Sequence, residues 1–329
     1  MSRLGCLFML LVAACGDDSR VHHLPDGPPF PDAAKGIYVT LAGNKLTVYA
    51  LDAVGDAAPL RTISGAATGL NLSLGFDVQP GTGDLFVANR MGGTVTVYPP
   101  EATGNVAPTK TLMATGMGSP AGVVFATNGD LYVSTCPGCG ASNGGLSGVF
   151  RFPAGSNTSD ATLGGTTNTN TMFTNPGVTI DPDTGNLVVG NSFGGNVSTF
   201  PASATGDVAP IRAFSPGAIN LQSVGVAAGT VFVTSGTGAA IQMFPIGATG
   251  TPTPVTMANG GMLNVNYPAG LFIEGAGTQP VIYLADFFGN KIHIIQTAGS
   301  APAFTVASVQ TIEGPSTGLV MPIGVKIVR

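Results

Sequence analysis

The chain has little charge, no tryptophan and no basic cluster. Asp, Glu, Lys and Arg make up 9% of its 329 residues, against about a quarter in an ordinary soluble domain. Residues that favour helices are scarce among them, and no long segment shows an apolar stripe with the helical period. This composition excludes a helical bundle. The net charge of −5 lacks the electrostatic footprint that DNA or RNA binding requires, so we expect no nucleic-acid partner.

Glycine and proline are abundant, with 49 and 25 residues, and they separate short apolar runs. Gly75–Pro99 (GFDVQPGTGDLFVANRMGGTVTVYP) holds three such runs, which is typical of an antiparallel meander. The pattern begins again at five later glycines, at intervals of 47, 55, 48, 45 and 54 residues: Gly122, Gly177, Gly225, Gly270 and Gly324. A repeat of roughly 40 to 50 residues indicates the blades of a β-propeller.

The first unit lacks the strand with which the later units begin. Ile37–Thr40, Lys45–Ala50 and Leu60–Ile63 match the second, third and fourth strands of a unit, whereas Gly324–Val328 matches a first strand. Together the two incomplete ends make one unit, so we expect the last strand to pair with Ile37–Thr40 and close a ring. The predicted fold is all-β, a six-bladed β-propeller that spans residues 37–329 as one domain.

A second repeat connects the third and fourth strands of several units. It reads ATGNVAP at Ala102–Pro108, ATGDVAP at Ala204–Pro210 and ATGTPTP at Ala248–Pro254, with a related form at Val54–Pro59. Glycine supplies a positive φ, Asn or Asp can bond its own backbone, and proline sets the entry to the next strand. We therefore predict a structural corner rather than a binding motif.

Residues 1–14 are predicted to be a lipoprotein signal peptide. Arg3 precedes an apolar run of about ten residues, which is too short to span a bilayer as a helix. The run ends in Val12–Cys15, which resembles the bacterial lipobox, and this resemblance implies that Cys15 carries lipid, including palmitate. An ordinary cleaved leader with an incidental cysteine is the alternative. Residues 15–36 are polar and proline-rich, and we interpret them as a tether.

A lipidated Cys15 would hold the exported protein on a membrane. Gly16 follows the cysteine where aspartate would favour inner-membrane retention, so resemblance to Gram-negative lipoproteins implies the outer membrane, on its periplasmic or surface side. Export also leads to an oxidising environment. We therefore expect Cys136 and Cys139 of the Cys-Pro-Gly-Cys sequence to form a disulfide, with a zinc site or a redox site as alternatives.

The units resemble those of NHL-type and related six-bladed propellers of bacteria, which combine a glycine-led apolar strand, a G-N-apolar-Y-V-A-N/D strand and a closing I-x-V-Y/F strand. Gly177–Asn191 is the nearest match, and the resemblance covers Ile37–Arg329. It implies a propeller with a ring-shaped binding surface. Because this family includes lactonases, lyases and interaction modules, the resemblance leaves the activity open.

The residues that end the second strands are expected at one mouth of the central channel: Leu41, Asn89, Thr135, Asn191, Ser235 and Asp286. Asn89, Asn191 and Asp286 could offer oxygen ligands to Ca²⁺, but one carboxylate among three groups favours strand capping over a tight metal site. The remaining candidates for a binding surface lie beside these positions: Arg90, Phe193, Tyr267, Phe287 and Phe288. The aromatic side chains could anchor a partner or pack between blades.

The third positions of neighbouring first strands carry opposite charges, Asp77 and Lys326. We expect these two side chains to approach each other near the channel, because unpaired charges there would be costly. A structural role is favoured over substrate binding.

A metal-dependent lactonase, hydrolase or lyase of the gluconolactonase-like propeller class is the enzymatic alternative. Glu313-Gly314-Pro315 resembles the E-G-P motif of that class, but it follows a fourth strand instead of lying in a first strand. His293, the one histidine beyond the tether, is expected to be packed within a strand rather than to act as an acid or base. We therefore expect a monomeric, non-catalytic scaffold without a cofactor that binds a protein or glycan.

Overall fold

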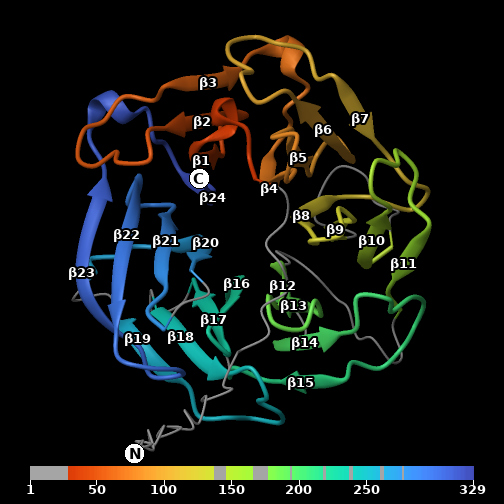
Figure 1. The fold of residues 1–329 in the computed structure, drawn as a ribbon, viewed down its shortest axis with the longest axis vertical. Coiled ribbons are helices and arrows are strands. Elements are labelled where there is room, and N and C mark those ends of the chain that lie inside the picture. Colours follow the sequence, from red (N-terminus) through yellow and green to blue (C-terminus); the bar gives the residue numbers. More distant parts are fainter. Residues whose placement is uncertain are drawn as a thin grey trace, which may run out of the picture.

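The computed structural model describes residues 29–136, 146–165, 177–192, 195–217, 220–236, 240–259, 263–275 and 278–329. Six four-stranded antiparallel sheets surround a central axis as the blades of a propeller (Figure 1). Three short 3-10 helices, η1 (Asp32–Ala34), η2 (Ala66–Thr68) and η3 (Pro315–Thr317), are the only helices in the described ranges. No helix there is both long and apolar enough to cross a membrane.

Each blade runs from an inner strand at the channel to an outer strand at the rim. Blade 1 contains β24 (Pro322–Val328), β1 (Gly36–Leu41), β2 (Lys45–Tyr49) and β3 (Arg61–Ser64). Blade 2 contains β4 (Ser73–Val78), β5 (Leu85–Asn89), β6 (Thr94–Tyr98) and β7 (Lys110–Leu112). Blade 3 contains β8 (Pro120–Phe125), β9 (Leu131–Thr135), β10 (Gly148–Phe152) and β11 (Ala161–Leu163).

The other three blades follow the same order from the channel outward. Blade 4 contains β12 (Val178–Ile180), β13 (Leu187–Asn191), β14 (Asn196–Phe200) and β15 (Arg212–Phe214). Blade 5 contains β16 (Leu221–Ala227), β17 (Thr230–Ser235), β18 (Ala240–Pro245) and β19 (Val255–Asn259). Blade 6 contains β20 (Pro268–Glu274), β21 (Val281–Asp286), β22 (Lys291–Ala298) and β23 (Thr305–Ile312).

The predicted ring closure is confirmed. β24 lies antiparallel to β1, with Ile327 opposite Ile37 and Val325 opposite Val39. The last strand of the chain thus supplies the inner strand of blade 1, and no blade is left with three strands. Buried apolar clusters fill the space between each pair of adjacent blades, so the ring has a continuous layer of core around the channel.

The glycines that mark the start of each unit let the inner strands approach one another. A Cβ placed on Gly270 of β20 would lie 2.1 Å from the carbonyl oxygen of Ile323 in β24. On Gly75 of β4 it would lie 2.4 Å from the carbonyl oxygen of Ala121 in β8. Real Cβ atoms do not approach backbone oxygen so closely, so a side chain at either site would push two blades apart.

The corner repeat also bridges adjacent blades. Gly104 of blade 2 donates its N–H to the carbonyl oxygen of Thr62 in β3 at 2.6 Å, and its own carbonyl accepts the N–H of Ser64 at 3.0 Å. We call this pair of bonds the inter-blade latch. Parallel bridges of the same kind join three further pairs of residues: Gly55 with Ile312, Gly206 with Leu163, and Gly250 with Phe214.

The residue after the latch glycine contributes a side-chain contact. Asn105 Oδ1 accepts the N–H of Ala67, at 2.8 Å, in the turn that follows β3. This amide occupies the space that a side chain would need at Gly65, since a Cβ there would lie 2.4 Å from Asn105 Oδ1. The same pairing of a glycine with an Asn or Asp recurs at two other latches: Gly314 with Asp56, and Gly165 with Asp207. The predicted corner therefore also joins neighbouring blades at the rim by hydrogen bonds.

Candidate binding face and central channel

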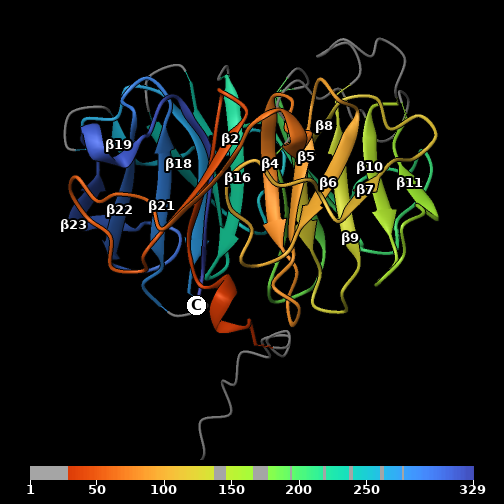
Figure 2. The same ribbon diagram turned by 90° about the horizontal axis from the view of Figure 1, so that it is seen from above.

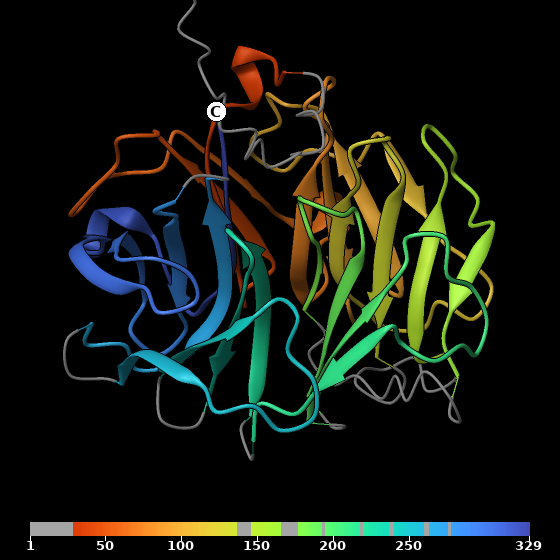
Figure 3. The ribbon, with the colours of Figure 1, turned by 60° about the horizontal axis from the view of Figure 1, so that its bottom comes forward.

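The propeller has two unlike faces. η1 and the end of β24 lie on one face, because Gly36 at the start of β1 pairs with Val328 (Figures 2 and 3). The turns that follow β1, β5, β9, β13, β17 and β21 lie on the opposite face. We call this second face the distal face. All six residues predicted to end the second strands do so, and all six are buried.

Asp286 is completely buried beneath the distal face of blade 6. Its carboxylate accepts the N–H groups of Tyr267 at 2.8 Å, Asn266 at 2.9 Å and Gly289 at 3.0 Å, and lies 3.4 Å from His293 Nε2. Burial alone would raise the pKa of Asp286, but the contacts with His293 and the three N–H groups outweigh it and lower the pKa. The ionised carboxylate thereby ties the entry to β20 to the turn after β21.

Asn89 has the same role in blade 2 and is also completely buried. Its Oδ1 accepts the N–H of Asn71 at 3.1 Å, just before β4, and its Nδ2 donates to Thr96 Oγ1 at 2.8 Å. Of the predicted mouth residues, Asn89 and Asp286 therefore direct their oxygen atoms to the backbone instead of to the channel opening. This arrangement corrects the expectation that these two side chains form part of an open binding surface. Asn191, the third proposed calcium ligand, is buried at the end of β13.

Three aromatic side chains of blade 6 gather on the distal face. Phe288 lies 4.9 Å from Phe287 and 5.3 Å from Tyr267 between ring centroids, and both pairs are close to perpendicular. Phe287 donates its N–H to the carbonyl oxygen of Tyr267 at 2.8 Å, so the two loops that carry the rings are joined. The ring of Phe288 remains 58% exposed. We call Tyr267, Phe287 and Phe288 the aromatic cluster.

The structure does not bring the other predicted surface residues into the aromatic cluster. Arg90 follows β5 and is half-buried, and burial lowers the pKa of its guanidinium. Cys136 is completely buried after β9. Phe193, Cys139 and Cys15 lie outside the described residues, so the disulfide, the position of Phe193 and the lipid attachment stay predictions.

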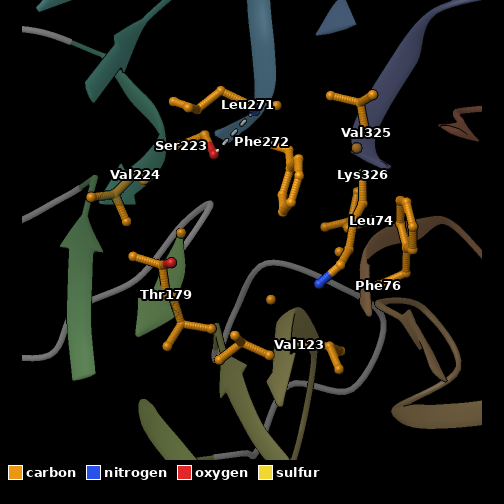
Figure 4. A pocket seen from close by; sticks show the side chains of 18 of the residues that line it. Leu74, Phe76, Val123, Thr179, Ser223, Val224, Leu271, Phe272, Val325 and Lys326 are labelled. Atoms are coloured by element: carbon orange, nitrogen blue, oxygen red, sulfur yellow. Dashed lines mark hydrogen bonds between the residues drawn. The ribbon is translucent and has the colours of Figure 1, made fainter. Parts of the chain in front are cut away.

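The central channel encloses a cavity of about 210 Å³ lined by the six inner strands (Figure 4). Most of its wall is apolar, as at Leu74, Val123 and Leu271. The predicted ion pair is present, with Lys326 Nζ bonded to Asp77 Oδ1. The ammonium group also lies 5.3 Å from the centre of the Phe272 ring, at a distance typical of a cation–π contact.

Asp77 is more than a counter-ion for Lys326. It is buried, and its Oδ2 accepts the N–H of Phe125 in β8 at 2.8 Å while Oδ1 accepts the N–H of Val78 at 2.7 Å. Since β24 belongs to blade 1, β4 to blade 2 and β8 to blade 3, this carboxylate joins three blades. The geometry supports the structural role that was favoured for the pair.

The residues that suggested enzymes lie apart from the channel. Glu313 follows β23, and its carboxylate bonds Thr311 Oγ1 at 2.7 Å and Lys291 Nζ at 3.4 Å. Pro315 begins η3. His293 is buried within β22 beside Asp286. None of these three residues lines the cavity, and the described residues contain no cluster of three or more His, Cys, Asp or Glu side chains that could hold a metal ion.

No family model and no curated protein matches this chain. Solved structures share its fold. A chain of the nidogen/laminin complex is 12% identical with a TM-score of 0.60, covering 90% of this chain and 98% of that one. A protein of unknown function from Bacteroides caccae is 11% identical with a TM-score of 0.61, covering 90% and 99%. A Bacteroides fragilis protein provisionally assigned as a 6-phosphogluconolactonase is 14% identical with a TM-score of 0.54, covering 92% and 87%. At such identities the comparisons establish the six-bladed propeller fold alone.

Proposed function

We propose that this protein is an exported, lipid-anchored scaffold that binds a partner protein through the aromatic cluster of its distal face. The observation that carries the proposal is the exposure of Phe288 on top of two packed aromatic rings. An exposed aromatic side chain on a rigid base is a frequent anchor of protein interfaces, because little entropy is lost when it is buried.

A protein partner suits this surface better than a glycan. Sugars need polar groups that converge with an aromatic platform, but the nearby Asp286 carboxylate is already bonded to the backbone. The side chains exposed on the neighbouring blade junction, Val320 and Met321, are apolar like Phe288. A partner with an apolar patch of its own would bury all of them.

The position of the chain's beginning agrees with this orientation. η1 leads into β1 from the face opposite to the aromatic cluster. A lipid on Cys15 would therefore hold that face toward the membrane, and the aromatic cluster would point away from it. We expect this anchor in the outer membrane, on its periplasmic or surface side.

Site-specific photo-crosslinking in the exporting cell tests the proposal. A photoreactive phenylalanine in place of Phe288 is expected to capture one protein of defined mass, whereas the same group in place of Leu60, which is equally exposed on the rim, is not. Labelled palmitate should enter the wild-type chain and not a Cys15→Ser variant. Identical adducts at both positions, a carbohydrate adduct at 288, or no adduct there would each refute the proposed binding role.

A further inference from the structure

One blade boundary differs from its neighbours at the rim. In the described part of the chain, inter-blade latches cross the boundaries between blades 6 and 1, 1 and 2, 3 and 4, and 4 and 5. Among the described residues no such bridge is present at the boundary between blades 2 and 3, whose outer strands are β7 and β11. The boundary between blades 5 and 6 also has none there, but its outer strands β19 and β23 contact each other directly. The outer edge of β7 is therefore not covered in the way that the edges of β3, β11 and β15 are.

The cause is a shorter corner in blade 3. In blade 2 the corner extends seven residues from Ala102, whose N–H bonds Pro99, to Thr109, whose N–H bonds Val97. The equivalent bonds in blade 3 are made by Ser156 and Asp160, which are four residues apart. The three missing residues correspond to the Thr-Gly-Asn of the latch.

The uncovered edge keeps the backbone geometry that the latch uses elsewhere. Leu112 pairs with Val95 in β6 just as Ile63 pairs with Leu46 in β2. By this shared register the carbonyl of Thr111 and the N–H of Met113 point outward, as the corresponding groups of Thr62 and Ser64 do. Neither outward group has a hydrogen-bond partner among the described residues.

The side chains agree with an open edge. Ala114 stands where β3, β11 and β23 are followed by Gly65, Gly165 and Gly314, so no Asn or Asp of a latch has to fit beside it. Met113 is 65% exposed. Next to it is a groove of about 430 Å³, lined by Met113–Thr115 of blade 2 together with Phe150 and residues 158–162 of blade 3.

We infer that this edge is a second docking site, which binds an extended peptide segment of a partner protein by adding a parallel bridge to β7. The latches of this chain show the chemistry of the occupant: a glycine or other small residue that donates to Thr111 and accepts from Met113. Glycine suits this position because the latch glycines adopt a positive φ between 62° and 72°, although a Cβ on them would meet nothing within 4 Å. A flanking apolar side chain would enter the groove beside Met113 and Phe150. Recognition of this kind resembles strand addition to a free sheet edge.

Two variants separate backbone docking from other modes. Met113→Pro removes the outward N–H, and Met113→Ala is its matched control because it removes only the side chain. An insertion of Thr-Gly-Thr between Ser156 and Asn157 restores the seven-residue spacing and covers the edge. The inserted sequence is that of the blade 5 corner, which has Thr where the other latches have Asn or Asp. This corner bonds blade 4, where Pro216 stands in place of the glycine, so it should also fit beside Ala114, which is not a glycine either. The insertion variant should melt at a higher temperature than the wild type, because it gains two inter-blade hydrogen bonds. This measurement also shows that the variant is folded.

The probe is a phage library of random linear peptides selected against the full-length wild-type protein. Enriched peptides are expected to bind the Phe288→Ala variant as they bind the wild type. The Met113→Ala variant should lose less affinity than Met113→Pro, because it loses the apolar contact in the groove and keeps the outward N–H. Their affinity for Met113→Pro should fall by about tenfold, the loss expected when one backbone hydrogen bond is removed. The insertion variant should bind them more weakly still, because the inserted corner occupies both outward groups. Equal affinity for all variants, a dependence on Phe288, or failure to enrich any peptide would overturn the inference.

Discussion

At the scale of single residues, the polar groups beneath the distal face hold the loops in place. Asp286 and Asn89 end equivalent strands, and both accept backbone N–H groups just ahead of the inner strand of their own blade. A buried polar group must find partners in the protein because water cannot reach it. Asp286 is therefore part of the framework that positions the aromatic cluster, whereas Asn89 fixes the equivalent loop of blade 2.

Replacement of Asp286 by asparagine should destabilise the protein by about 1–3 kcal/mol. The new amide nitrogen is a donor, and it would face a backbone N–H group whose hydrogen bond the carboxylate oxygen now accepts. The pKa of Asp286 is lowered in the folded state. Its ionised form therefore stabilises the fold at neutral pH, and this contribution is lost as the pH falls through the lowered pKa. In urea unfolding, the difference from wild type should shrink below about pH 4.

Asp52→Asn is the matched control, since Asp52 is exposed and has no side-chain hydrogen bond among the described residues. It should leave the free energy of unfolding unchanged across the same pH range. A difference between wild type and Asp286→Asn that is constant from about pH 3 to 7 would contradict the role assigned to the carboxylate.

At the scale of elements, the inner strands are packed by backbone contact. Gly270→Ala should lower the free energy of unfolding by about 1–3 kcal/mol, because its Cβ would overlap the carbonyl oxygen of Ile323 on the next blade. Gly43→Ala serves as control, since a Cβ at Gly43 meets nothing within 4 Å. Chemical denaturation of both variants measures the effect, and equal stabilities would show that the inner strands can separate without cost.

At the scale of the whole molecule, closure of the ring depends on β24. Removal of Met321–Arg329 leaves β1 with an unpaired inner edge and removes Lys326 from Asp77. The truncated protein is expected to unfold or to form oligomers, as measured by thermal melting and size-exclusion chromatography. Arg329→Ala, which keeps β24 and loses the ion pair with Glu274 and the hydrogen bond to Tyr283 Oη, should remain a folded monomer. A truncated protein that melts like the full-length chain would refute closure by β24.

The whole ring also explains why one face can bind while the other is anchored. Every second strand runs from the face of η1 to the distal face, so the chain enters on one side and the aromatic cluster stands on the other. The boundary between blades 2 and 3, where β7 has no latch among the described residues, lies on the rim between these faces. A protein bound at the aromatic cluster and a peptide bound at β7 would therefore occupy separate surfaces.

Much of the fold follows from the sequence alone. The unit length, the glycine turns and the two complementary ends predict six blades and their closure, because alternating apolar runs are encoded locally and the number of units is counted along the chain. The same alignment of units places Asn89 and Asp286 at strand ends, and Asp77 beside Lys326. The strand register within one repeat depends on residues close together in the chain, so it can be predicted without knowledge of the tertiary structure.

Other features were decided only when the blades came together. The sequence shows that Asp286 ends a strand, but the three N–H groups that consume its oxygen atoms come from a loop that folds back and from its own turn. Likewise, the sequence predicts the Thr-Gly corner as a turn only. Its second role depends on the hydrogen bond from Gly104 to Thr62, which lies 42 positions earlier in the chain. These contacts depend on the distance between neighbouring blades, which apolar packing across the whole ring sets. For the same reason, it takes the assembled propeller to show that the described residues leave the outer edge of β7 without a latch.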